Sequence, residues 1–150
     1  MSLEVMKSFY AAFERRDTEA MVSLYDDNVI FSDPVFPRLN GIQAKNMWRM
    51  LNKKSQDLKV KARDFAENGS YCTCTWDAHY SFGPNNRPVH NIVQARMLIQ
   101  NGKITEHTDD FDFWRWTRMA VGPLGYLAGW SPFLRNKIQS TAAANLQKFG

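Results

Sequence analysis

The spacing of apolar residues predicts three helices in the first third of the chain. Residues 3–17, 18–25 and 40–54 each carry apolar side chains three or four positions apart. Asp17 precedes the second of these segments and is a suitable N-cap for it. A short strand at residues 29–36 separates the second helix from the third. We expect these side chains to face the core: Val5, Phe9, Ala12, Phe13, Met21, Leu24, Tyr25, Ala44, Met47, Trp48 and Leu51.

From Leu58 the apolar period becomes two, which is typical of strands. Strands are predicted at residues 58–67, 70–82, 87–100 and 103–116, with turns at 68–69, 83–86 and 101–102. Strands joined by such short turns pair as an antiparallel meander. Phe65 breaks the alternation of the first of these strands, which predicts a β-bulge near Arg63 or Asp64.

Residues 119–150 return to a helical pattern. Ser131 is expected to be the N-cap and Pro132 the first residue of a last helix. The preceding residues 120–130 carry no charge, and they could form a lid, a dimer contact or packing across the sheet, of which packing is favoured. We interpret residues 1–118 as the main domain and residues 119–150 as its helical extension.

Composition agrees with one folded domain. The chain has 150 residues, of which 44% are hydrophobic and 23% charged. The net charge is +4, but Lys and Arg are scattered, so nucleic-acid binding is not expected. Cys72 and Cys74 are expected to be reduced, since they lie on one face of one strand. No signal-like run and no uncharged stretch of about 20 residues is present, so we expect a cytoplasmic protein without a membrane span.

The hairpin turns predict which residues share a face. A two-residue turn at 101–102 would place Gln100 opposite Lys103, Arg96 opposite His107, and Gln94 opposite Asp109. His90, Gln94, Arg96, His107 and Asp109 then form one polar cluster. If the turn at 83–86 pairs Tyr80 with His90 and Trp76 with Gln94, this cluster lies on the inner face. The prediction depends on register, because a slip of one residue would turn every member outward.

Such a cluster on an aromatic face predicts a pocket that orients and deprotonates a small molecule. Asp33 adds a carboxylate in an apolar segment, where it must turn outward, find partners or hold a proton. The alternative is a structural network in which Arg96 pairs with Asp109. Asp77 and His79 would lie on the other face. The catalytic candidates are Asp33, Gln94, Arg96, His107 and Asp109, and the substrate-binding candidates are Phe9, Trp48, Trp76, Tyr80, His90, Phe111 and Phe113.

The local sequence resembles the nuclear transport factor 2-like superfamily, in particular its SnoaL-like and ketosteroid-isomerase-like proteins. The resemblance lies in residues 9–36, with D-x-E-A at 17–20 and Asp-Pro at 33–34, and in residues 102–113. It implies an α+β fold, in which a cone-shaped, curved antiparallel sheet wraps around N-terminal helices and an internal pocket. It also places the isomerase base on Asp33 and the SnoaL-type pocket acid on Asp109.

The isomerase's two oxyanion donors would fall on Phe9 and Gln94, which lack an acidic hydroxyl, so steroid isomerisation is not expected. The resemblance further implies a homodimer that pairs through the outer sheet face. We expect Val93, Ala95, Met97 and Ile99 to supply the apolar surface there.

The sequence therefore predicts a protein that binds a small apolar or carbonyl-bearing ligand. It would act as a cofactor-independent isomerase, cyclase or hydrolase, with Asp33 or Asp109 as base, His107 as proton shuttle, and Arg96 and Gln94 at the oxyanion. No metal is implied, because His107 and Asp109 have no third ligand. Epoxide hydrolysis ranks lower, since Arg96 lacks an Asp two residues later.

Two alternatives remain at this stage. The first is a non-catalytic ligand-binding or dimerisation module. The second is association with a membrane surface through residues 123–130, flanked by Arg115, Arg118 and Arg135.

Overall fold

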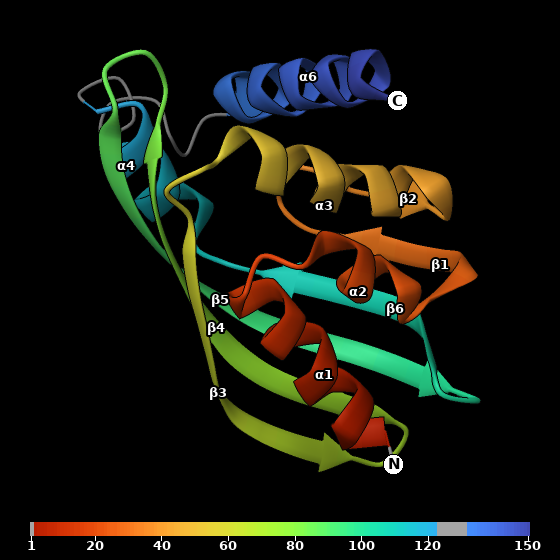
Figure 1. Ribbon diagram of the computed structural model, residues 1–150. Coiled ribbons are helices and arrows are strands. Elements are labelled where there is room, and N and C mark those ends of the chain that lie inside the picture. The colour runs from red at the N-terminus through yellow and green to blue at the C-terminus, as the bar shows by residue number, and fades with distance from the viewer. Residues whose placement is uncertain (1, 123–131) are drawn as a thin grey trace.

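The computed structural model describes residues 2–122 and 132–150, which form an α+β fold around one sheet (Figure 1). The strands lie in the order β2-β1-β6-β5-β4-β3, so β2 and β3 are the edges. The strands are β1 (Tyr25–Ser32), β2 (Leu39–Asn40), β3 (Lys59–Asn68), β4 (Tyr71–Phe82), β5 (Arg87–Gln100) and β6 (Lys103–Asp110). The helices are α1 (Ser2–Glu14), α2 (Thr18–Ser23), α3 (Ile42–Lys54), α4 (Phe113–Ala120) and α6 (Pro132–Phe149).

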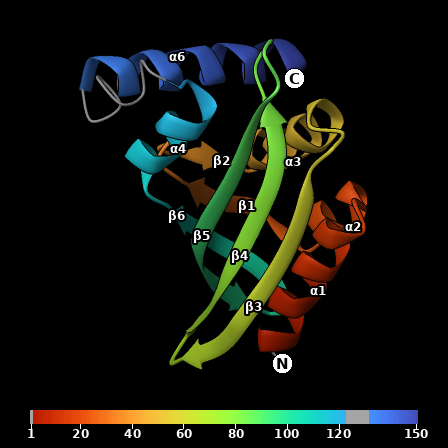
Figure 2. The same ribbon diagram turned by 90° about the vertical axis from the view of Figure 1, so that its left-hand side faces the viewer.

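The sheet is mixed. Strands β3 to β6 form the predicted antiparallel meander, whereas β1 runs parallel to β6. The sheet is strongly curved, and α1, α2 and α3 lie on its inner side (Figures 1 and 2). The predicted α+β architecture is therefore confirmed, with one parallel pair added.

The core lies between the helices and the inner face of the sheet. Phe9 and Phe13 of α1 and Trp48 of α3 are almost completely buried there. Asp17 caps α2 as predicted, since its carboxylate accepts a hydrogen bond from the Ala20 backbone N–H at 3.1 Å. The apolar faces of the N-terminal helices thus pack as their spacing predicts.

The predicted bulge in β3 is confirmed. The register between β3 and β4 shifts between Arg63 and Ala66, and Asp64 has a positive φ of 60°. A bulge increases the local twist of the bulged strand, so this one contributes to the curvature of the sheet.

The predicted registers of both later hairpins are wrong by one residue. In the first, Tyr80 pairs with Val89 rather than with His90. In the second, Gln100 does face Lys103, but the register then shifts between Ile99 and Leu98. Ile99 pairs with Ile104 and Leu98 with Glu106, so Thr105 is the extra residue of a bulge.

The bulge at Thr105 decides which residues of β6 share the inner face with those of β5. Met97 is paired with His107 and Ala95 with Asp109, so these four side chains share the inner face. The prediction that Val93, Ala95, Met97 and Ile99 form an apolar outer face for a dimer is therefore wrong, because each is at least 92% buried within one chain. Gln94 and Arg96 occupy the exposed outer positions instead.

The last predicted strand is also too long. β6 ends at Asp110, and Asp112 caps α4 by accepting a hydrogen bond from the Arg115 backbone N–H at 3.0 Å. α6 begins at Pro132 as predicted, while the expected cap Ser131 and residues 123–130 lie outside the described residues. α6 lies beside α3 (Figure 1). None of the described helices has both the length and the hydropathy required to cross a membrane.

Candidate functional site

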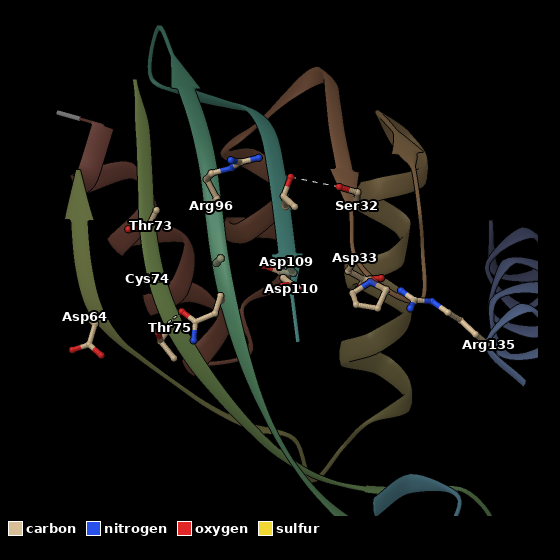
Figure 3. Close-up of a pocket in the computed structure, with 14 residues that line it drawn as sticks. Ser32, Asp33, Asp64, Thr73, Cys74, Thr75, Arg96, Asp109, Asp110 and Arg135 are labelled. Carbon is tan, nitrogen blue, oxygen red and sulfur yellow. Dashed lines mark hydrogen bonds between the residues drawn. The ribbon is translucent and has the colours of Figure 1, made fainter. Parts of the chain in front are cut away.

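Two hollows among the described residues lie on opposite faces of the sheet. The inner cavity, of about 620 Å³, lies between the inner face, α3, α4 and α6. The outer hollow, of about 750 Å³, is lined mainly by polar side chains of the outer face, including Thr73, Thr75, Gln94, Arg96 and Asp110 (Figure 3). The inner cavity combines an apolar wall with a few polar groups, which is the usual character of a small-molecule site.

The apolar wall of the inner cavity contains four of the predicted substrate-binding residues. Trp48, Trp76, Tyr80 and Phe111 all line it. The other three predicted residues do not. Phe9 lies in the core against Trp48 and His107, Phe113 packs on Trp116, and His90 faces outward. From α6, Leu134, Ile138 and Ala142 close one side of the cavity.

His107 and Asp109 form the buried polar centre of the site. Their side chains are 0% and 3% exposed, and His107 Nε2 lies 2.8 Å from Asp109 Oδ1. Asp109 lines the inner cavity, and Trp76 Nε1–H donates to the same carboxylate oxygen at 3.5 Å. A buried carboxylate requires such donors, because burial otherwise disfavours its charge.

A chain of hydrogen bonds orients the imidazole of His107. The Trp48 indole N–H can only donate, and it lies 2.8 Å from the Tyr25 hydroxyl oxygen. The Tyr25 O–H is therefore directed to His107 Nδ1 at 2.7 Å, which leaves the proton of His107 on Nε2, facing Asp109. Burial raises the pKa of Tyr25 well above its usual value, so this hydroxyl keeps its proton.

Asp33 lies in a tight turn at the wall of the inner cavity. Its Oδ1 accepts hydrogen bonds from the backbone N–H groups of Val35 at 2.8 Å and Phe36 at 2.6 Å. Burial, together with the charge of Asp109, raises the pKa of Asp33 to about 7 against the opposing effect of these bonds. The next carbonyl, that of Pro34, accepts a hydrogen bond from Gln139 of α6 at 2.9 Å.

Gln94, Arg96 and His90 do not line the inner cavity, so the expectation that they share the inner face with His107 and Asp109 is wrong. Gln94 and Arg96 line the outer hollow, whose wall also includes Asp33 and Asp109. Gln94 accepts a hydrogen bond from the Thr75 hydroxyl at 2.9 Å, and Arg96 stacks over the ring of Tyr71. These three side chains alternate with the buried positions of β5, because β4 pairs Trp76 with Val93 rather than with Gln94 and so reverses the predicted faces. The alternative pairing of Arg96 with Asp109 is wrong for the same reason.

On the outer face, His90 bonds to Asp77 at 3.1 Å and stacks on His79. The predicted outward placement of Asp77 and His79 is thus confirmed. Figure 3 shows Arg96 standing on this side of the sheet, away from the helices behind it.

Sequence reasoning missed Asn91, which lines the inner cavity and is 6% exposed. The sequence does contain a pattern that predicts its inward position. Val89, Val93 and Ala95 alternate in step with Asn91 on β5, and these apolar residues mark the inner face. Among the residues that the structure describes, no group of three or more His, Cys, Asp or Glu side chains is arranged to hold a metal ion. Cys72 and Cys74 are buried free thiols.

The comparisons with known proteins agree with this architecture. A family model described as a SnoaL-like domain matches residues 6–107. No curated protein is significantly similar in sequence to this chain.

Several solved structures share the fold. A putative polyketide cyclase from Pseudomonas putida matches with a TM-score of 0.69 and 20% identity, over 80% of this chain and 98% of its own. An LEH-like epoxide hydrolase from M. tuberculosis matches with a TM-score of 0.65 and 16% identity, over 83% and 92%. A hypothetical protein with a ketosteroid isomerase-like fold from Catenulispora acidiphila, in complex with trimethylamine, matches with a TM-score of 0.69 and 13% identity, over 80% and 94%.

Proposed function

The chain belongs to the SnoaL-like domain family, and on that basis we propose that its inner cavity binds a small, apolar, carbonyl-bearing molecule on which Asp33 transfers a proton. The observation that carries the proposal is the position of Asp33 at the cavity wall with a pKa of about 7. Because one fold hosts many reactions, the argument rests on the site rather than on the names of structural neighbours.

A carboxyl group with this pKa is present in both protonation states at neutral pH. The ionised form removes a proton from the carbon next to a carbonyl group, and the resulting acid returns it elsewhere on the molecule. The apolar wall formed by Trp48, Trp76 and Phe111 keeps water away from this exchange. Such a reaction needs no bound metal or redox group.

Asp109 and His107 have supporting roles in this proposal. Asp109 lines the cavity, and its charge helps to keep the pKa of Asp33 high. His107 is fully buried behind Asp109, so it acts as a positioning residue rather than as the proton shuttle that the sequence predicts.

A non-catalytic ligand-binding module is the second candidate. It is favoured by the outward position of Arg96 and Gln94, the expected oxyanion donors. The same position argues against epoxide hydrolysis by Asp33, Arg96 and Asp109, because the guanidinium group cannot reach a ligand in the inner cavity.

Hydrogen exchange at a carbon acid tests the proposal directly. The probe is 2-tetralone in D₂O, whose loss of the hydrogens next to the carbonyl is followed by proton NMR. We expect the protein to accelerate exchange, with a rate that rises with pH and levels off above about pH 7, because the ionised carboxylate is the base. Asp33→Asn should lower the protein-dependent rate by about 10² or more.

The matched control is Asp110→Asn, which makes the same change on the exposed face of β6. It should leave exchange unaltered. Equal rates for the protein and Asp33→Asn would contradict the role of Asp33. Binding of 2-tetralone without any exchange would instead support the non-catalytic alternative.

A further inference from the structure

Asn91 presents a side-chain amide to the inner cavity. Asn91 is 94% buried, the complement of its 6% exposure, and it lines the inner cavity. None of the hydrogen bonds within the described parts of the chain involves this amide, which can donate two and accept two. An amide that faces the cavity from a largely apolar wall is therefore available to bind a polar group of a ligand.

Tyr80 offers a second donor to the same space. Its hydroxyl oxygen accepts a hydrogen bond from Trp116 Nε1–H at 2.7 Å, which occupies one lone pair and leaves the O–H proton to donate. Tyr80 lines the inner cavity, and burial raises its pKa, so the proton is retained.

The two donors are neighbours on the sheet. Ala78 of β4 pairs with Asn91, while Tyr80, two residues further along β4, pairs with Val89. Tyr80 and Asn91 therefore stand diagonally on the same inner face, a relationship that brings Cβ atoms to about 7 Å in antiparallel sheets. Asp33 is close enough for its charge to affect the pKa of Tyr80, so acid and donors surround one volume.

We infer that the Asn91 amide and the Tyr80 hydroxyl together bind the carbonyl oxygen of the ligand in the inner cavity. They take the role of oxyanion donors that the sequence assigned to Gln94 and Arg96. This inference rests on the proposed function, because it names the groups that hold the oxygen of the molecule on which Asp33 acts. It also defines the ligand class as one with an apolar body and a hydrogen-bond-accepting oxygen.

The test compares two probes of nearly equal shape, 2-acetylnaphthalene, which has a carbonyl group, and 2-isopropenylnaphthalene, which has a C=CH₂ group in its place. Dissociation constants are measured by fluorescence titration, and the C=O stretch of the bound ketone by infrared spectroscopy. We expect the ketone to bind about 10-fold more tightly than the alkene, with its stretch at lower wavenumber than in hexane. Asn91→Leu should remove most of this preference and raise the stretching frequency, and Tyr80→Phe should do so in part.

Gln94→Leu is the matched control, since it removes an amide from the outer face of the same strand and should change neither readout. Circular dichroism establishes that each variant is folded. Equal affinity for the two probes, or an unchanged ratio and stretch in both Asn91→Leu and Tyr80→Phe, would overturn the inference.

The outcomes separate this inference from the role of Asp33. A ketone preference that depends on Asn91, without deuterium exchange of 2-tetralone, would sustain the donor pair and refute proton transfer. Exchange that depends on Asp33, without a preference for the ketone, would sustain proton transfer and refute the donor pair. Failure of both naphthalene probes to bind would overturn the donor pair, and exchange of 2-tetralone would still decide the role of Asp33.

Discussion

His107 Nε2 lies 2.8 Å from Asp109 Oδ1, and both residues point from β6 into the interior. The pair is tied on one side to Tyr25 and Trp48 and on the other to Trp76. It therefore joins the first strand, α3 and the meander through one buried set of hydrogen bonds. The side on which the His107–Asp109 pair lies is the face of the sheet that lines the inner cavity.

Removal of His107 should destabilise the protein strongly. His107→Leu leaves Asp109 and the Tyr25 hydroxyl buried without their main partner, which costs on the order of 3 to 5 kcal/mol when one member of a buried pair is lost. Urea denaturation measures this loss. His79→Leu, on the outer face, is the control and should cost less than about 1 kcal/mol. Similar losses in the two variants would show that the buried network does not stabilise the fold.

The pKa of Asp33 predicts how stability depends on pH. Its folded pKa of about 7 lies above the ordinary value of 3.8, so the folded state binds the proton more tightly than the unfolded state. This contribution is complete below about pH 4, decreases as the pH rises, and is lost above about pH 7. The total effect is at most about 4 kcal/mol at 1.4 kcal/mol per pH unit.

Asp33→Asn should therefore gain stability relative to the unmodified protein as the pH rises from about 4 to 7. Thermal unfolding of both proteins across that range checks this, and a carbon NMR titration of the Asp33 carboxyl group measures the pKa directly. An NMR value near 4 would contradict the prediction.

The Asn91 amide should contribute nothing to the stability of the ligand-free protein. Asn91→Leu removes an amide that bonds to none of the described residues and adds apolar contact, so we expect a gain of about 1 kcal/mol. Gln94→Leu, which breaks the bond with Thr75 at an exposed site, should give no gain. Thermal unfolding without added ligand distinguishes the two. A loss of stability in Asn91→Leu would mean that the amide has a structural role.

Ala142 tests whether α6 forms a wall of the inner cavity. Ala142 lines the cavity, so Ala142→Trp should fill part of it and weaken binding of 2-acetylnaphthalene by about 10-fold or more. The neighbouring Ala143 is exposed and does not line the cavity, so Ala143→Trp is a closely matched control. Fluorescence titration provides the measurement. Equal affinities in the two variants would contradict the position of α6.

Arg96 should have no direct effect on the inner cavity. Arg96→Ala removes an exposed side chain that stacks on Tyr71, so ketone affinity and deuterium exchange should change by less than about twofold. The sequence-based assignment of Arg96 to the oxyanion predicts a large loss in both measurements. The experiment thus distinguishes the two registers of β5 and β6 in solution.

Much of the architecture could be predicted from local patterns. Helical spacing identified the buried faces of α1 and α3, and the interrupted alternation at Phe65 located the β3 bulge. Asp33 and Asp109 were recognised from a family resemblance, and both line the inner cavity. These features were accessible because each depends on a few neighbouring residues, whose spacing fixes the direction of the side chains.

The sequence by itself determined the helices, the meander and the set of polar residues available to a site. Only the tertiary structure decided which of them meet, because one extra residue at Thr105 reverses the faces of β5 relative to β6. That bulge brings Met97 and Ala95 beside His107 and Asp109, while the pairing of Trp76 with Val93 turns Gln94 and Arg96 to the outside. Side chains alternate with a period of two along a strand, so the choice rests on packing across the whole sheet and not on any local signal.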